Sequence, residues 1–279
     1  MSTNKNTLNK LLTLLRRKQL VEIPKVVNAP RILEGKIALI TGGSSGIGLA
    51  FAKKFIEVGA KVIIAGTNEE KLKKCLDEIG NRDSVRALVL NVLEVQSLPG
   101  KVAEALNLFA EHRIDILVNS AGVRNELGFL TTTEEDYDHV MDVNMKGTFF
   151  MSQAIAKYMI ENKIKGHILN LASSSSKRPA WNAYQVSKWG VRGFTTGLAD
   201  TLSEYGIIVN AIAPGPVATP FMGFQDGGNC TLEKQPMHRY AYPKEIAELA
   251  AFMVSDLGNL IVGDTFFISG GSGVTTLHG

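Results

Sequence analysis

Residues 36–58, KIALITGGSSGIGLAFAKKFIEV, decide the fold. The apolar run at 37–40 predicts a buried strand, and the stretch after the glycines predicts a helix. Between them, Gly42, Gly46 and Gly48 follow the spacing G-x-x-x-G-x-G, which differs from the usual dinucleotide fingerprint G-x-G-x-x-G. Glycines allow a tight turn and close backbone approach, and a new helix offers unpaired N–H groups to a phosphate. The alternative is a plain loop between strand and helix.

The rest of the chain repeats this alternation of short apolar runs and helical stretches, which indicates βαβ units. Most runs are continuously apolar, as expected of parallel strands covered on both faces. The sequence therefore predicts an α/β chain with a doubly wound, mostly parallel seven-stranded sheet, a Rossmann fold. Ligands of such sheets bind at the carboxyl ends of the strands. The predicted strands are residues 36–41, 61–66, 85–90, 114–119, 166–171, 206–213 and 264–269.

Composition narrows the class of protein. Of 279 residues, 45% are hydrophobic and 20% charged, with a formal charge of +3, which is typical of a soluble globular protein and excludes a basic nucleic-acid footprint. Cys75 and Cys230 cannot form a disulfide framework, and the five histidines are scattered, so we expect a reduced, cytoplasmic setting and no metal site. No apolar run approaches the roughly 18 residues of a membrane span.

The first 34 residues differ from the rest. Residues 7–20, TLNKLLTLLRRKQL, form a basic amphipathic helical pattern, and no acid appears before Glu22. We expect an extension over 1–34, which packs on the domain or on a neighbouring subunit, followed by a single domain over 35–279. Attachment to a membrane surface and mitochondrial targeting remain alternatives.

The end of the second strand bears on the choice of nicotinamide cofactor. An acid there would bind the ribose 2′-hydroxyl and repel a 2′-phosphate. Here Gly66, Thr67 and Asn68 occupy the tip, and the acids begin only at Glu69. The sequence therefore favours NADP(H) over NAD(H), held by Ser44, Thr67 and Asn68.

Tyr184 and Lys188 are four residues apart in a stretch with helical spacing, so they should lie on one face of a helix. A nearby ammonium stabilises a phenolate, and we expect it to lower the tyrosine pKa from about 10 toward the operating pH. Such a tyrosine serves as a general acid or base.

Together these segments resemble the short-chain dehydrogenases/reductases over residues 35–271. The resemblance rests on TGGSSGIG at 41–48, NSAG at 119–122, VNMKG at 143–147, NLAS at 170–173, YQVSK at 184–188 and APGPVATPF at 213–221. Among activities in that family, the chain looks most like 3-oxoacyl-(acyl-carrier-protein) reductases.

The resemblance implies catalytic roles. Tyr184 would be the proton donor, Lys188 would lower its pKa and bind the nicotinamide ribose, Ser173 would polarise the substrate carbonyl, and Asn144 would hold a relay water. Ser174 and Ser175 remain alternatives to Ser173. Asn144 could instead be a structural polar residue that forms hydrogen bonds with the backbone. The implied cofactor-binding residues are Gly42, Ser44, Ser45, Gly46, Ile47, Gly48, Thr67, Asn68, Asn91, Val92, Asn119, Ala121, Gly122, Tyr184, Lys188, Pro214, Gly215, Val217 and Thr219.

The chain departs from the family pattern on the substrate side. Ser173 precedes Tyr184 by 11 residues, a shorter interval than usual, and the shortened piece is KRPAWNA at 177–183. Trp181 within it is either a wall of the pocket or a core residue. Residues 223–242 lie where this family closes a lid over the substrate.

The expected function is hydride transfer between NADP(H) and a small carbonyl or secondary alcohol substrate, with a 3-oxoacyl thioester as one candidate. The alternatives are a hydroxysteroid or sugar-alcohol dehydrogenase, and a catalytically silent, cofactor-binding regulatory protein. The resemblance also implies a homodimer or homotetramer built on helices near 133–161 and 183–204. Gly190, Gly193 and Gly197 leave a strip on the latter where a helix could approach.

Overall fold

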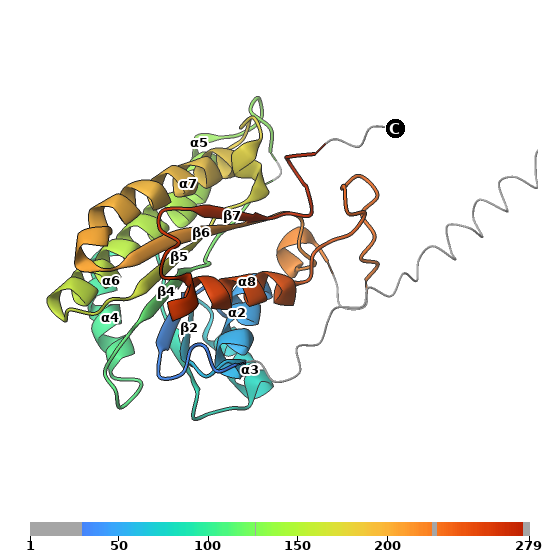
Figure 1. Cartoon of the computed structure of the whole chain (residues 1–279). Helices are drawn as coiled ribbons and strands as arrows, with labels where there is room; N and C mark the ends of the chain where they lie inside the picture. The colour runs from blue at the N-terminus through green and yellow to red at the C-terminus, as the bar shows by residue number, and fades with distance from the viewer. Residues whose placement is uncertain (1–29, 126, 225–227, 276–279) are drawn as a thin grey trace, which may run out of the picture.

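A single seven-stranded sheet forms the centre of the molecule (Figure 1). The computed structural model describes residues 30–125, 127–224 and 228–275. The strand order is β3-β2-β1-β4-β5-β6-β7, and each neighbouring pair in the described residues is parallel, which confirms the predicted fold class. All seven predicted strands are present. Their bounds are β1 Ile37–Thr41, β2 Lys61–Gly66, β3 Val85–Val89, β4 Ile116–Asn119, β5 His167–Leu171, β6 Ile208–Pro214 and β7 Thr265–Ile268.

Helices cover both faces of the sheet (Figure 1). Helices α2, α3 and α8 pack on one face; α4, α6 and α7 pack on the other, with α5 beside α7. Their bounds are α2 Gly46–Glu57, α3 Glu69–Ile79, α4 Leu98–Leu106, α5 Glu134–Met141, α6 Thr148–Glu161, α7 Ala183–Leu202 and α8 Pro243–Met253. Short helical turns are η1 Val95–Ser97, η2 Asp142–Gly147, η3 Ser174–Lys177, η4 Ser203–Tyr205, η5 Pro220–Met222 and η6 Asp256–Gly258.

The two-sided burial of β1 explains its unbroken apolar sequence. Successive side chains of a strand point to opposite faces. Ala38 and Ile40 accordingly belong to the core under α2 and α8, whereas Ile37 and Leu39 belong to the core under α4 and α6. Both faces of this strand are therefore buried in hydrophobic core.

The chain is already packed before β1 begins. Leu33 is fully buried in the core that includes α2, and its N–H donates to the Val58 carbonyl at 3.0 Å. The expected N-terminal amphipathic helix lies outside the described residues. Within the described part of the chain, none of the helices combines the length and hydrophobicity needed to cross a membrane.

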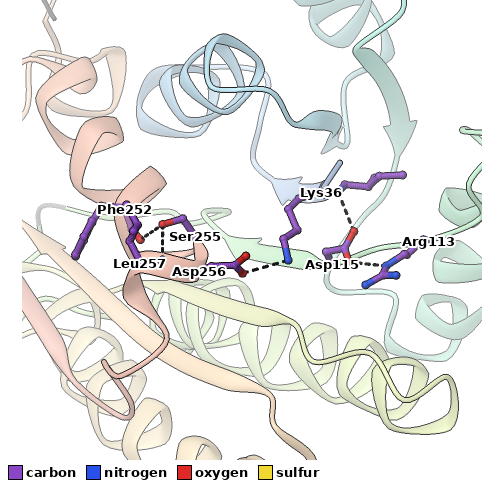
Figure 2. Close-up of polar contacts among 8 residues, drawn as sticks. Lys36, Arg113, Asp115, Phe252, Ser255, Asp256 and Leu257 are labelled. Atoms are coloured by element: carbon purple, nitrogen blue, oxygen red, sulfur yellow. Dashed lines mark hydrogen bonds and ion pairs between the residues drawn. The ribbon is translucent and has the colours of Figure 1, made fainter. Parts of the chain in front are cut away.

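At the amino ends of the strands, one buried carboxylate joins β1 to the segment that leads into β4 (Figure 2). Asp115 is 3% exposed; its Oδ2 accepts from the Ile37 N–H at 3.0 Å, and its Oδ1 pairs with Arg113 Nε at 2.5 Å. Lys36 extends the other way and pairs with Asp256 at 3.3 Å. The Asp256 side chain is 74% exposed, so only the first of these two acids is inside the protein.

Replacing Asp115 with Ala should lower the free energy of unfolding by about 2 kcal/mol, because it leaves a buried N–H of Ile37 without an acceptor. The matched control is Asp256→Ala, which removes an exposed ion pair and should cost less than about 0.5 kcal/mol. Urea unfolding of both variants measures the difference. Equal losses would contradict this account of Asp115.

Candidate active site

A cavity of about 300 Å³ lies at the carboxyl ends of the strands. It opens where β1 and β4 are neighbours and the chain leaves them toward opposite sides, which is the position at which such sheets bind ligands. The lining comes from the segments after β1, β4, β5, β6 and β7 and from α7. The predicted site residues that line it are Gly42, Ser45, Gly46, Ile47, Gly48, Ala121, Gly122, Ser173, Tyr184, Lys188, Pro214, Gly215, Val217 and Thr219.

The glycine turn leaves no room for side chains. A Cβ at Gly48 would lie 2.3 Å from the Gly42 carbonyl oxygen, and one at Gly42 would lie 2.9 Å from the backbone N of Ala121. Gly42 also has φ +65°, which favours glycine. Ser45 precedes α2 without a capping side-chain hydrogen bond, and the first turn of α2 has no acid. The turn therefore fits a dinucleotide pyrophosphate, which would accept from the free N–H groups of α2.

The side chain of Thr41, the last residue of β1, holds the loop after β4 beside this turn. Its Oγ1 accepts from the backbone N–H groups of Ser120 and Ala121 at 3.1 and 3.2 Å, and donates to the Val118 carbonyl at 3.4 Å. Because Thr41 is 2% exposed, these hydrogen bonds are shielded from water. One hydroxyl thus joins the ends of the two strands that frame the cavity.

Tyr184 and Lys188 lie on one face of α7, as predicted. The Lys188 Nζ is 5.8 Å from the centre of the Tyr184 ring and donates to the Leu171 carbonyl at 2.7 Å. The helix starts at this point because the Asn182 side chain caps it, accepting from the Gln185 N–H at 2.9 Å. Burial lowers the pKa of Lys188 from 10.5 to about 8.

The pKa of Tyr184 differs from the sequence-based expectation. Burial raises it, while a hydrogen bond with the Ser173 side chain and the positive charge of Arg124 lower it to a smaller extent. Removal of water around the phenol disfavours the phenolate and outweighs both. Tyr184 is therefore held as a neutral phenol, which is the form that donates a proton.

Among the four consecutive serines, Ser173 has the contact with Tyr184. Ser173 is 8% exposed, and its Oγ accepts from the Ser175 N–H at 3.1 Å. Ser174 and Ser175 also line the cavity. Ser176 is fully buried and donates to the Ser173 carbonyl at 2.7 Å, so it supports the loop.

Asn144 lies behind the cavity in the π-helical turn η2. This conformation is rare in proteins overall but occurs frequently at functional sites. Its Oδ1 accepts from the Val123 N–H at 2.9 Å. Its Nδ2 donates to the Val123 carbonyl at 2.9 Å and to Ser187 Oγ at 3.0 Å. The side chain therefore positions the loop after β4 against α7, which matches the structural alternative.

Some predicted residues lie outside the cavity lining. Asn68 caps α3 and accepts from the Lys71 N–H at 2.8 Å, with exposed Thr67 beside it at the end of β2. Asn119 is buried in the sheet and donates to Ser152 and Asn170. The predicted residues outside the lining are Ser44, Thr67, Asn68, Asn91, Val92, Asn119 and Asn144.

Sequence reasoning missed several side chains of the cavity wall. These are Arg124, Arg178, Phe221, Gln235 and Ser272. Arg178 belongs to the shortened piece at 177–183, whose unusual length was the one signal in the sequence. Trp181 in the same piece is 54% exposed and is not part of the lining, so neither the wall nor the core interpretation was right.

Comparison with known families decides among the chemistries that this geometry allows. The sequence profile of a family described as short chain dehydrogenase matches residues 36–226. The chain belongs to this family. As a short-chain dehydrogenase, it is an NAD(P)-dependent oxidoreductase.

Similar proteins include other short-chain dehydrogenases of nearly the same length. The 3-oxoacyl-(acyl-carrier-protein) reductase of Aquifex aeolicus is 34% identical over 86% of this chain and 98% of the relative. The oxidoreductase UcpA of Salmonella typhimurium is 37% identical over 86% and 95%. The structure of 3-ketoacyl-(acyl-carrier-protein) reductase from Brucella melitensis complexed with NADH has a TM-score of 0.79 and 32% identity, covering 86% of this chain and 99% of that one.

Replacing Lys188 with Met should raise the free energy of unfolding at pH 7 by about 1 to 2 kcal/mol, even though it removes the hydrogen bond to Leu171. The folded pKa near 8 lies below the usual 10.5, so the folded chain carries a disfavoured charge below pH 8. Between pH 8 and 10.5 the unfolded chain binds more protons, and the stability of the wild type rises with pH.

The gain of the Lys188→Met variant should therefore shrink as pH approaches 10.5. Urea unfolding at pH 7 and pH 10 measures it. The control is Lys146→Met, whose exposed ammonium pairs with Asp142, and which should change stability little at either pH. A Lys188→Met variant less stable than wild type at pH 7 would refute this account.

Proposed function

We propose that this short-chain dehydrogenase transfers hydride between NADP(H) and a carbonyl or secondary alcohol, with 3-oxoacyl compounds as the first substrate class. The observation that carries the proposal is that Ser173, Tyr184 and Lys188 line one cavity, with the Lys188 Nζ 5.8 Å from the centre of the Tyr184 ring. Two similar proteins are named as 3-oxoacyl reductases, and this supports 3-oxoacyl compounds as the substrate class.

In the proposed reduction, the hydroxyl of Tyr184 donates its proton to the substrate carbonyl oxygen. Ser173 Oγ donates a hydrogen bond to the same oxygen and stabilises the charge that develops there. The bound nicotinamide supplies the hydride to the carbonyl carbon. Lys188, held by the Leu171 carbonyl, stabilises the phenolate that remains on Tyr184. In the oxidation each of these steps is reversed.

The cofactor fits between two walls of backbone. The glycine turn and the start of α2 would hold its pyrophosphate, and Val217 and Thr219 after β6 would contact the nicotinamide. A Cβ at Gly46 would lie 3.4 Å from the Thr219 Cγ2, so the two walls come close at this point. Ser173, Tyr184 and Lys188 line the same cavity, within reach of a nicotinamide held there.

The preference for NADP(H) rests on the tip of β2. Thr67 and Asn68 are exposed there, and residues 66–68 of the tip include no carboxylate that would repel a 2′-phosphate. The side-chain oxygen of Asn68 is used as the cap of α3, so its amide NH₂ group is the donor that it offers. The NADH of the Brucella relative belongs to that protein and does not support this preference.

We also propose that the enzyme assembles as a homodimer or homotetramer through α6 and α7. Phe149, Val186 and Trp189 on these helices are 41%, 39% and 43% exposed. At Gly193 and Gly197 a Cβ would have no atom within 4 Å, so these glycines leave an open strip. At Gly190, by contrast, a Cβ would meet Met145 of the same chain at 2.7 Å, so this glycine serves internal packing.

The Tyr184→Phe variant should lose about 10²- to 10⁴-fold in kcat, because the phenol is the proton donor. The measurement is oxidation of NADPH with 3-oxoacyl thioesters, simple ketones, steroids and sugars. The control Tyr205→Phe removes the hydroxyl of an exposed tyrosine at η4 and should be fully active. NADPH binding without turnover of any class would instead support the regulatory alternative.

The dissociation constant for NADPH should be at least about 10-fold lower than that for NADH. Thr67→Asp places a carboxylate at the tip of β2 and should reverse this order by repelling the 2′-phosphate. Asn81→Asp, the same change of charge in an exposed loop before β3, is the control. Fluorescence titration measures both constants, and equal values for the wild type would remove the preference.

A further inference from the structure

Arg178 places a positive charge on the wall of the active-site cavity, five residues after Ser173. It is half-buried, and its Nη2 donates to the Ser272 Oγ at 2.7 Å. Ser272 is 2% exposed and lines the same cavity. A hydroxyl from the segment after β7, 94 residues away, therefore fixes the direction of this guanidinium.

Two further contacts hold Arg178 in place. The Trp189 Nε1 of α7 donates to the Arg178 carbonyl at 2.8 Å, which fixes its backbone. A Cβ at Gly273 would lie 3.0 Å from the Arg178 Nε and 3.2 Å from the Ser174 carbonyl oxygen, so a glycine there leaves space for the arginine. Gly273 also has φ +80°, which favours glycine. The loop after β5, helix α7 and the segment after β7 thus all contribute to the position of Arg178.

Among the described residues, the lining of the cavity offers Arg178 no acidic partner. The described lining residues include the cations Arg124, Arg178 and Lys188 and no Asp or Glu. Within the described part of the chain, Arg178 forms no ion pair. A guanidinium has five N–H donors, of which the hydrogen bond to Ser272 uses one. A half-buried charge with unused donors is stabilised by an anion in the cavity.

The cofactor phosphates do not need this charge. The pyrophosphate fits the glycine turn and the start of α2, and the 2′-phosphate is expected at the tip of β2. Arg178 instead lies beside Ser174 on the loop that carries Ser173. Its planar fork matches a carboxylate, which it can bind through two parallel hydrogen bonds.

We propose that the substrate carries a carboxylate close to its reacting carbon and that Arg178 binds this carboxylate. This inference rests on the proposed function and narrows its substrate class to oxo acids and hydroxy acids, including acyl compounds with a free carboxylate. Neutral steroids and sugars, and 3-oxoacyl thioesters without a free carboxylate, would leave the arginine charge unpaired in the cavity.

The test compares acetoacetate with methyl acetoacetate, which has the same ketone and no charge. With NADPH, the wild type should have the higher kcat/KM on acetoacetate. Arg178→Met should lower kcat/KM for acetoacetate by about 30-fold or more, mainly through KM, because a charge-assisted pair is lost. The value for methyl acetoacetate should change by less than about 3-fold.

Lys177→Met is the matched control. It removes the neighbouring positive charge, whose Nζ lies over the Phe267 ring at 3.8 Å and outside the cavity lining. This variant should leave kcat/KM for both substrates unchanged. Arg178→Lys should recover part of the acetoacetate activity, since it restores the charge without the planar fork. The dissociation constant for NADPH should be the same in all variants.

A purely structural role for Arg178 predicts a different result. In that case Arg178→Met and Ser272→Ala would lower the thermal midpoint and reduce the activity on both substrates equally. That outcome overturns the proposal. It is also overturned if the wild type has the higher kcat/KM on the methyl ester, if kcat/KM for acetoacetate is the same in Arg178→Met, or if Arg178→Met binds NADPH more weakly.

Calorimetric titration of acetoacetate into the enzyme with NADP⁺ tests the carboxylate site separately from the proposed reaction. Binding that is lost in Arg178→Met without any turnover supports the carboxylate site while the proposed reaction fails. Turnover of neutral ketones that requires Tyr184 but not Arg178 leaves the reaction standing and overturns the carboxylate site. Absence of acetoacetate binding to the wild type overturns it as well.

Discussion

The close packing of the turn after β1 on the loop after β4 is the constraint on which the cavity depends. The two segments approach so closely that a Cβ at Gly42 would lie 2.9 Å from backbone atoms of Ala121, and one at Gly48 would lie 3.1 Å from the Ser120 hydroxyl oxygen. The buried hydroxyl of Thr41 maintains this approach by accepting from two N–H groups of the neighbouring loop. Because both segments are fixed, the amino end of α2 faces the cavity, and the proposed catalytic residues of α7 and the β5 loop line the same cavity.

Most of the fold could be predicted from the sequence, since the signals are local. The seven strands are short apolar runs, and buried parallel strands have this pattern. The spacing of Tyr184 and Lys188 was enough to place them on one helical face. Their electrostatics was not predictable, because the pKa of Tyr184 depends on how much water the walls of the cavity exclude.

The substrate side of the cavity could not be predicted, since it is built by contacts between distant segments. The hydrogen bond between Arg178 and Ser272 forms only because β7 pairs with β6, which brings the end of the chain to the loop after β5. Asn144 shows the same limit: the family resemblance implied a relay role, whereas the hydrogen bonds of its side chain to Val123 and Ser187, which hold a loop, join segments that are far apart in the sequence. The cofactor side is made of backbone and glycine spacing, which sequence reveals directly.

The hydrogen bond from Arg178 to Ser272 also has a consequence for the order in which the protein is completed during its synthesis. The glycine turn and the first strands leave the ribosome early, whereas Ser272 and Gly273 follow β7, the last strand of the sheet to be made. The nucleotide-binding half can therefore fold during translation. The wall that holds Arg178 closes only after the segment that follows β7 has been made, so a product truncated before Ser272 would have a nearly complete sheet and an unfinished substrate wall.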